Sequence, residues 1–199
     1  LDELKLTKYI TVFSGTSIGA FNSVLFAMND MKKADELWEE VTMDKLVPIS
    51  KSELIKRGIG LYIGGKNLQL AKKFLNYKLE HGAIANDGAI EVVEKYLDFN
   101  KIKENNKICY AACTKLSDFS AKYFKINEFD EETGKKIVLA SASLPLIYDC
   151  TEVLGEKYID GGIADNIPIQ PVYGENCNII IVVLLSKEVQ VDRTLYPNS

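Results

Sequence analysis

The stretch that decides the fold is Gly15-Thr16-Ser17-Ile18-Gly19. It reads G-x-S-x-G and stands between an apolar run, residues 9–13, and an amphipathic stretch, residues 20–28. This order predicts a strand, a sharp turn and a helix, which is the context of a nucleophile elbow. Such a turn holds its serine in a strained backbone and directs the hydroxyl out of the sheet. The two glycines lack a Cβ, so we expect them to let the strand and the helix approach closely around Ser17.

A plainer interpretation of the same pentapeptide stays open. G-x-S-x-G also occurs in ordinary loops, and Ser17 stands where a helix-capping serine would stand. Under either interpretation, the following helix brings unpaired N–H groups and a partial positive charge to the turn.

A second motif, Asp160-Gly161-Gly162, follows the short strand-like segment Tyr158-Ile159. An aspartate before two glycines is typical of a tight turn in which the carboxylate bonds to its own backbone. Together with the upstream serine, the same carboxylate becomes a candidate general base.

The histidine content limits the mechanism. His81 is the one histidine of the chain, and Gly82 follows it at the end of a helical pattern. This arrangement is ordinary for a solvated helix C-terminus, so we do not expect His81 to be a catalytic base. A serine nucleophile without histidine needs another activating group, and a carboxylate is the available choice.

These motifs resemble those of the patatin-like phospholipase family. The resemblance rests on G-T-S-I-G-A at residues 15–20, D-G-G at 160–162 and A-S-A-S-L-P at 140–145, and it extends over nearly the whole chain. It implies a lipid acyl hydrolase (a phospholipase A or lysophospholipase-like esterase) with a Ser-Asp dyad, an acyl-serine intermediate and no cofactor. Ser17 is then the nucleophile and Asp160 the base. The other candidate site residues are Gly15, Thr16, Ile18 and Gly19 in the elbow, and Gly161 and Gly162 in the Asp loop.

One feature of the family is missing from the sequence. Its members carry a glycine-rich loop upstream of the elbow, whose N–H groups stabilise the oxyanion, and no G-G-G or G-x-G precedes Gly15. The N–H of Ile18 supplies one donor, and losing one such donor typically costs about a hundred- to a thousand-fold in turnover. We therefore expect these 199 residues to be a fragment of a longer protein, cut before Leu1 and also after the polar C-terminal tail. We expect the fragment alone to have little activity.

Two further functions stay open beside lipid acyl hydrolysis. One is a non-catalytic homologue that binds a lipid or a protein. The other is a serine esterase that acts on soluble esters. Leu144, Leu146, Ile147 and Tyr148 either line an acyl pocket or belong to the core.

The amino-acid composition and net charge of the chain limit the classes of molecule that it is expected to bind. The 199 residues suit a single domain, 1–199, with 47% hydrophobic and 26% charged residues. The net charge is −4 and no basic stripe is visible, which argues against nucleic acid and against electrostatic attachment to anionic lipid. We expect a lipid or ester substrate, met through apolar surface in transient contact with a membrane. The longest apolar run, residues 179–185, is too short for a transmembrane helix and predicts a buried strand.

The alternation of patterns predicts an α/β three-layer sandwich with a mostly parallel sheet. Strands are expected at 9–13, 107–114, 121–126 and 178–185, and helices at 18–28, 35–46, 52–55, 67–79, 89–97 and from 130 toward 143. Sites in such folds gather beyond the carboxyl ends of the strands. We therefore expect the side chains of Ser17 and Asp160 to lie about 3 Å apart, with or without a water between them.

The remaining singular residues are expected to be structural. Trp38 shares a helical spacing with its apolar neighbours and is expected in the core. The lysine face of the 67–79 helix is either solvated or in contact with a membrane. The four cysteines lack further metal-ligand partners nearby and are expected to be buried free thiols, which suits a cytoplasmic location; they are Cys109, Cys113, Cys150 and Cys177.

Overall fold

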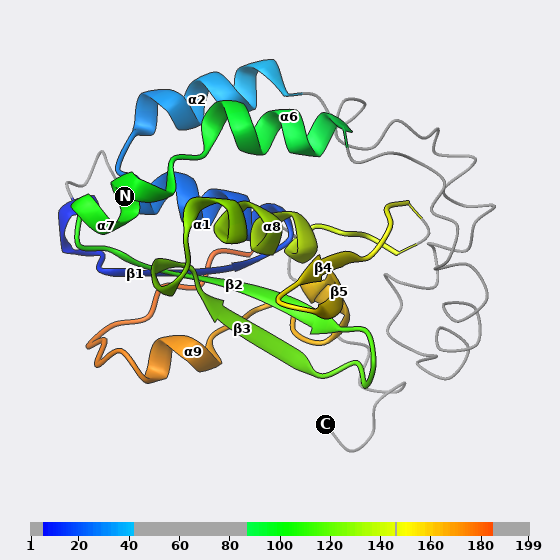
Figure 1. Cartoon of the computed structure of the whole chain (residues 1–199). Helices are drawn as coiled ribbons and strands as arrows, with labels where there is room; N and C mark the ends of the chain where they lie inside the picture. The colour runs from blue at the N-terminus through cyan, green and yellow to red at the C-terminus, as the bar shows by residue number, and fades with distance from the viewer. Residues whose placement is uncertain (1–5, 42–86, 146, 185–199) are drawn as a thin grey trace, which may run out of the picture.

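The structure is a computed structural model that describes residues 6–41, 87–145 and 147–184. These residues form a sheet with helices on both faces (Figure 1). The strands are β1 (Val12–Thr16), β2 (Ile108–Lys115), β3 (Ala121–Lys125), β4 (Thr151–Val153) and β5 (Glu156–Asp160). The helices are α1 (Ile18–Ala27), α2 (Met31–Glu40), α6 (Asp87–Tyr96), α7 (Phe99–Glu104), α8 (Glu131–Ser141) and α9 (Gln170–Tyr173), with 3-10 turns η1 (Thr7–Tyr9), η3 (Ile126–Glu128) and η4 (Gly161–Ile163).

Strand β2 is the centre of the sheet. β1 runs parallel to it, from the pair Val12–Ile108 to the pair Thr16–Ala112. Beyond that point β5 pairs antiparallel with residues 113–115 on the same edge, while β3 pairs antiparallel along the opposite edge. β4 completes the sheet beside β5.

The α/β sandwich that the sequence predicts is confirmed, but its sheet is mixed. Among the described strands, β1 with β2 is the parallel pair and the other pairs are antiparallel. Short connections account for two of the antiparallel pairs, since β3 follows β2 and β5 follows β4 through short turns, whereas a parallel pair needs a long crossover.

Two layers of helices cover one face of the sheet. α1 and α8 lie directly on the strands, α2 and α6 lie over them, and α9 is on the opposite side (Figure 1). The core lies between α1, α8 and the sheet, and its largest fully buried side chains include Leu25, Met28 and Ile137. α1 is apolar over most of its circumference, as expected of a helix that is covered on several sides.

The first strand begins three residues later than the sequence predicts. Residues 7–9 form a 3-10 turn, and β1 includes the polar residues Ser14 and Thr16. Their hydroxyls donate to the backbone carbonyls of Pro168 (2.7 Å) and Asp165 (2.9 Å). Because these hydrogen bonds satisfy the polar groups, the strand continues through a stretch whose hydrophobicity alone would end it.

Most other predicted elements are confirmed within one to three residues. The helix at 18–28, the paired strands at 107–114 and 121–126, and the helix at 89–97 correspond to α1, β2 with β3, and α6. α8 ends at Ser141, before Pro145 is reached. α2 contains residues 35–40 of the helix predicted at 35–46, but it begins four residues earlier, at Met31, and ends at Glu40, because Val41 is already extended. The predictions at 52–55 and 67–79 and the residues His81 and Leu146 lie outside the described residues.

The strand predicted at 178–185 is wrong for the residues that are described. Positions 179–184 form no strand, and their apolar side chains are 36–79% exposed. Apolar and β-branched residues favour a strand, but a strand also needs a neighbour that accepts and donates its backbone hydrogen bonds. None of the described strands pairs with this run.

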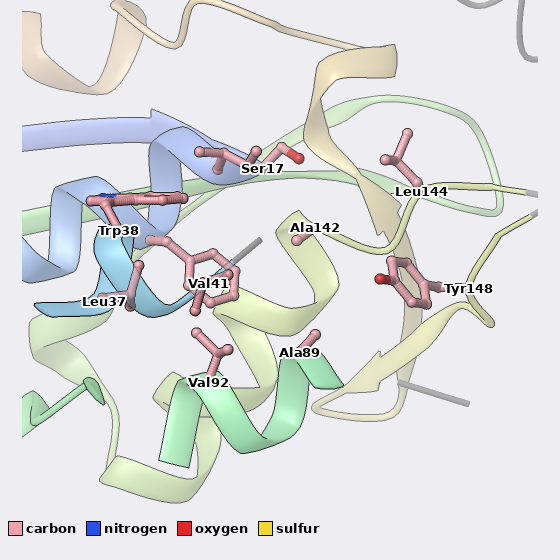
Figure 2. A pocket seen from close by; sticks show the side chains of 11 residues that line it. Ser17, Leu37, Trp38, Val41, Ala89, Val92, Ala142, Leu144 and Tyr148 are labelled. Carbon is pink, nitrogen blue, oxygen red and sulfur yellow. The ribbon is translucent and has the colours of Figure 1, made fainter. Parts of the chain in front are cut away.

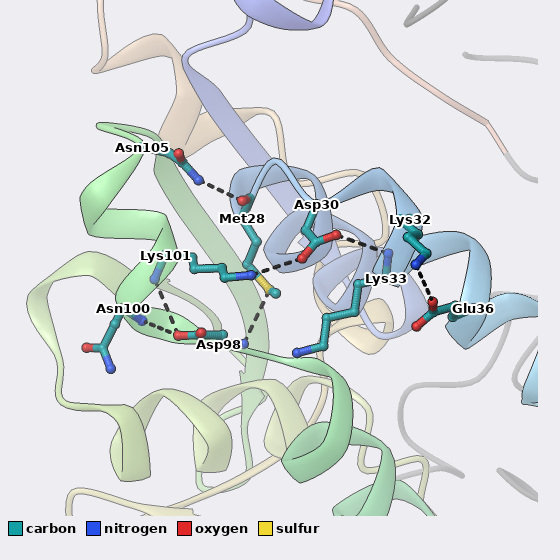
Figure 3. A network of polar contacts seen from close by, with 9 residues as sticks. All are labelled: Met28, Asp30, Lys32, Lys33, Glu36, Asp98, Asn100, Lys101 and Asn105. Carbon is teal, nitrogen blue, oxygen red and sulfur yellow. Dashed lines mark hydrogen bonds and ion pairs between the residues drawn. The ribbon is translucent and has the colours of Figure 1, made fainter.

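Polar contacts join the turn between α1 and α2 to α7 (Figure 3). Asp30 accepts from the backbone N–H of Lys33 at the start of α2 and forms an ion pair of 2.9 Å with Lys101. The hydrogen bond from the side chain of Lys101, together with the one from the backbone N–H of Lys33, holds the pKa of Asp30 below its usual value. Asn105 donates to the carbonyl of Met28 (2.6 Å), which fixes the end of α1.

The cysteines differ in burial. Cys109 and Cys113 are buried in β2 as predicted, and burial raises the pKa of both thiols well above the usual range. Cys150 and Cys177 are only partly buried. Within the described ranges, no group of three or more His, Cys, Asp and Glu side chains is arranged to hold a metal ion. The helices described are all too short or too polar to cross a lipid bilayer.

Candidate active site

Ser17 stands at the bend between β1 and α1 with an unusual backbone. Its φ is 56° and its ψ is −124°, a combination that residues with a side chain rarely adopt. The Ser17 N–H donates to the hydroxyl of Ser141 (3.0 Å), and the Ser17 carbonyl accepts from Ala20 in the first turn of α1 (2.9 Å). The backbone strain that the elbow motif predicts is present, and tertiary contacts maintain it.

The hydroxyl of Ser17 is not used as a helix cap. Ser17 occupies the cap position of α1 but makes no side-chain capping bond. Its Oγ takes part in no hydrogen bond among residues 6–41, 87–145 and 147–184. The capping interpretation is therefore wrong in this structure, and the hydroxyl is available for other chemistry.

The two glycines of the elbow are not equivalent. A Cβ at Gly15 would clash with the backbone carbonyl of Gly19 and would lie 2.6 Å from the hydroxyl of Ser23. A Cβ at Gly19 would meet no described atom within 4 Å. The expected close approach of strand and helix is thus confirmed for Gly15, whereas no described atom would obstruct a side chain at Gly19.

This difference predicts effects of different size for two matched substitutions. Gly15→Ala should lower the free energy of unfolding by about 3 kcal/mol, since the new methyl group meets backbone that cannot move away. Gly19→Ala, in the first turn of α1, should change it by less than about 1 kcal/mol, because alanine favours the helix. Urea unfolding followed by circular dichroism measures both. A Gly15→Ala protein as stable as Gly19→Ala would show that the close approach is not essential.

Asp160 is the last residue of β5 and is 2% exposed. Its Oδ1 accepts from the N–H of Gly162 (2.8 Å), so the turn role that the plainer interpretation predicts is present. Only glycine fits at position 161, because a Cβ there would clash with the carbonyl of Ala112. The negative charge of Asp160 adds to burial in raising the pKa of Cys113, its cross-strand neighbour.

The sheet brings the two motifs together. β1 and β5 share one edge of β2 and run in opposite directions, so their C-terminal ends meet at Ala112 and Cys113. Consistent with this, a Cβ at Gly161 would lie 3.0 Å from the methyl group of Thr16. The separation of about 3 Å that the sequence predicts between the Ser17 hydroxyl and the Asp160 carboxylate stays a prediction.

Further contacts hold the loop after Asp160 against β1 and β3. Thr16 donates to the carbonyl of Asp165 (2.9 Å), and Tyr123 donates to the Asp165 carboxylate (2.6 Å). Partial burial, together with this carboxylate, raises the pKa of Tyr123 to about 12. The loop is therefore fixed at its two ends, by Asp160 in the sheet and by Asp165 through two side chains.

An apolar pocket opens beside Ser17 (Figure 2). Its volume is about 80 Å³, and nearly all of its lining is hydrocarbon. Figure 2 shows Ser17 at one side, Leu144 and Tyr148 at another, and side chains of α2 and α6 opposite. The lining residues are Ser17, Ile18, Phe21, Leu37, Trp38, Val41, Ala89, Val92, Ala142, Leu144 and Tyr148.

The pocket decides an alternative that the sequence left open and corrects the expectation for Trp38. Leu144 and Tyr148 line it, and burial raises the pKa of the Tyr148 hydroxyl, whereas Ile147 is a buried residue outside the lining. Trp38 was expected in the core and is instead 39% exposed at the pocket, where its Nε1 donates to Asn22 (2.9 Å). Helical spacing cannot distinguish a core face from a pocket wall, because both are apolar, so the residues that α2 and α6 contribute could not be found from the sequence.

Ile18 supplies a further element of the site. It is the first residue of α1, so its N–H is among those at the helix start that have no partner within the helix. Beside a nucleophile, such an N–H can hold the negative oxygen of a tetrahedral intermediate.

Comparison with known proteins agrees with this geometry. No curated protein was found to match the chain significantly. The family model of patatin-like phospholipases matches residues 1–173, which include both motifs and the segment between them. The chain therefore belongs to the patatin-like phospholipase family, whose members are lipid acyl hydrolases.

Proposed function

We propose that this protein is a serine hydrolase of lipid carboxylic esters in which Ser17 and Asp160 form a catalytic dyad. The observation that carries the proposal is the Ser17 hydroxyl, which makes no capping bond, stands on a strained turn and borders an apolar pocket. The meeting of the β1 and β5 ends on β2 supports Asp160 as its partner.

The proposed reaction has two acyl-transfer steps. Asp160 takes the proton from the Ser17 hydroxyl while the serine oxygen attacks the ester carbonyl. Backbone N–H groups at the start of α1, including that of Ile18, hold the oxyanion. The proton then passes to the departing alcohol or lysolipid. Water, deprotonated by Asp160, cleaves the acyl-serine and regenerates the enzyme.

The pocket indicates how the acyl chain binds. Its hydrocarbon lining suits an acyl chain and offers no charged group for a headgroup. Its volume of about 80 Å³ compares with about 150 Å³ for a cavity that takes up benzene, so the described pocket holds only the carbons nearest the ester. With a net charge of −4, contact with a lipid surface would depend on apolar residues rather than on attraction to anionic headgroups.

The small volume also favours a second candidate, an esterase of short soluble esters. The two functions use the same dyad and differ in whether the substrate lies in an aggregate. A phospholipase should hydrolyse vesicles faster than monomeric esters, and a soluble esterase should show the opposite preference.

One experiment tests the class and separates the candidates. The natural full-length protein is treated with a fluorophosphonate probe, and its hydrolysis of p-nitrophenyl butyrate is compared with that of phosphatidylcholine vesicles. We expect covalent labelling at Ser17, located by mass spectrometry of the labelled peptide, and release of fatty acid from the vesicles. Labelling with hydrolysis of the soluble ester alone would favour the second candidate. Absence of labelling and of hydrolysis would identify a non-catalytic homologue.

A further inference from the structure

We propose that the C-terminal turn of α8, residues 140–143, is the element that positions Ser17 relative to Asp160, with Ser141 as a positioning residue. This inference rests on the proposed function, because it assigns Ser141 a role in the same reaction. It starts from the hydroxyl of Ser141, which is 0% exposed and lies between the central strand and the elbow.

The hydroxyl of Ser141 links β2 to the elbow at Ser17, two segments that lie far apart in the sequence. It donates to the carbonyl of Ala112 in β2 (2.6 Å) and accepts from the backbone N–H of Ser17 (3.0 Å). The direction of both bonds is determined, since an N–H only donates and a carbonyl only accepts. The Ser17 N–H is thus held by a side chain that is itself anchored to β2.

The same turn also holds the candidate base. The carbonyl of Ser143, two residues after Ser141, accepts from the backbone N–H of Asp160 (2.9 Å). Ala112, to which Ser141 donates, is the residue against which Gly161 packs. One short segment therefore contacts the backbone of both Ser17 and Asp160, and both contacts converge on the end of β2 where β1 and β5 meet.

The strain at Ser17 is the reason that this contact affects catalysis. A residue at φ 56° keeps that conformation only while its surroundings oppose relaxation. Removing the Ser141 hydroxyl leaves the Ser17 N–H without its acceptor, and rotation of the peptide between Thr16 and Ser17 would then relieve the strain. Such a rotation moves the Ser17 hydroxyl, and a shift of about 1 Å in a reacting group can cost roughly a hundred-fold in rate.

Asn127, in η3, offers a matched control outside the turn. Its side chain also bridges two backbone groups, since it donates to the carbonyl of Lys107 (2.6 Å) and accepts from the N–H of Cys109 (2.9 Å). Neither bond involves Ser17, Asp160 or residues 140–143. Asn127→Ala therefore removes as many side-chain hydrogen bonds from β2 and its neighbours as Ser141→Ala, without changing the proposed positioning element.

The test compares Ser141→Ala with Asn127→Ala in the natural full-length protein, using p-nitrophenyl butyrate. Both variants should lose thermal stability. Ser141→Ala should lower kcat by about 10- to 100-fold and slow fluorophosphonate labelling by a similar factor, with KM within about 3-fold of the parent. Asn127→Ala should keep kcat within about 3-fold, because its hydrogen bonds lie at the start of β2 and not at the elbow. Equal kcat values for the two variants would overturn the proposal.

Two additions keep the outcome interpretable. If Ser17→Ala retains turnover, the proposed function itself fails. If Ser17→Ala loses turnover but Ser141→Ala and Asn127→Ala do not differ in kcat, only the positioning role is rejected. If Ser141→Ala does not fold, Ser141→Thr and Ser141→Val replace it, since they have nearly equal volume and differ in the hydroxyl. The threonine protein should then turn over at least about 10-fold faster than the valine protein, and equal rates would again reject the role.

Discussion

Replacing Ser17 by alanine should lower ester turnover by the natural full-length protein by about a million-fold, the loss found when a serine protease is deprived of its nucleophile. The loss is expected because, in the proposed mechanism, Ser17 alone forms the acyl-enzyme. Stability should change by less than about 0.5 kcal/mol, because the Ser17 hydroxyl makes no hydrogen bond among the described residues and does not cap α1. Initial rates with p-nitrophenyl butyrate and thermal unfolding measure the two quantities.

A second serine serves as the control for Ser17→Ala. Ser120 lies in the exposed turn before β3, its hydroxyl donates to Asp118 (2.6 Å), and it is not among the residues that line the pocket. Ser120→Ala should keep full turnover and full fluorophosphonate labelling. Labelling that persists in Ser17→Ala would assign the nucleophile to another residue and end the proposal.

Replacing Asp160 by asparagine should lower kcat by about ten-thousand-fold, by analogy with removal of the triad aspartate in serine proteases. The asparagine amide cannot take up the proton of Ser17. Its carbonyl oxygen can still accept from the N–H of Gly162, so the turn that Asp160 forms should survive. Asp160→Asn therefore separates the proposed role as a base from the structural role that the turn already demonstrates.

Asp165 gives the matched control for this substitution. It lies in the same loop, and its carboxylate accepts from Tyr123 and from the N–H of Ile167. Asp165→Asn should keep kcat within about 10-fold, because an amide oxygen can continue to accept these bonds. If a folded Asp160→Asn protein hydrolysed esters as fast as Asp165→Asn, a carboxylate other than Asp160, or none, would activate Ser17.

The local chemistry of both motifs could be predicted from the sequence because it depends on residues that are adjacent in the chain. G-x-S-x-G between an apolar run and an amphipathic run predicts the strand, the bend and the helix around Ser17. D-G-G likewise predicts the turn at Asp160. The same reasoning failed at the described residues 178–184 of the predicted strand, where the apolar pattern was clear but strand formation depends on a neighbour.

The sequence by itself therefore determined the α/β class, the family, and the two residues proposed as nucleophile and base. Only the tertiary structure decided that β1 and β5 meet end to end on β2 and that Ser141 holds the elbow. It further decided that a side chain would clash at Gly15, whereas at Gly19 it would meet no described atom. It also decided that Trp38 faces the pocket rather than the core. The physical reason is that these features are contacts between segments far apart in the chain, and hydrophobic periodicity within one segment carries no information about its neighbour.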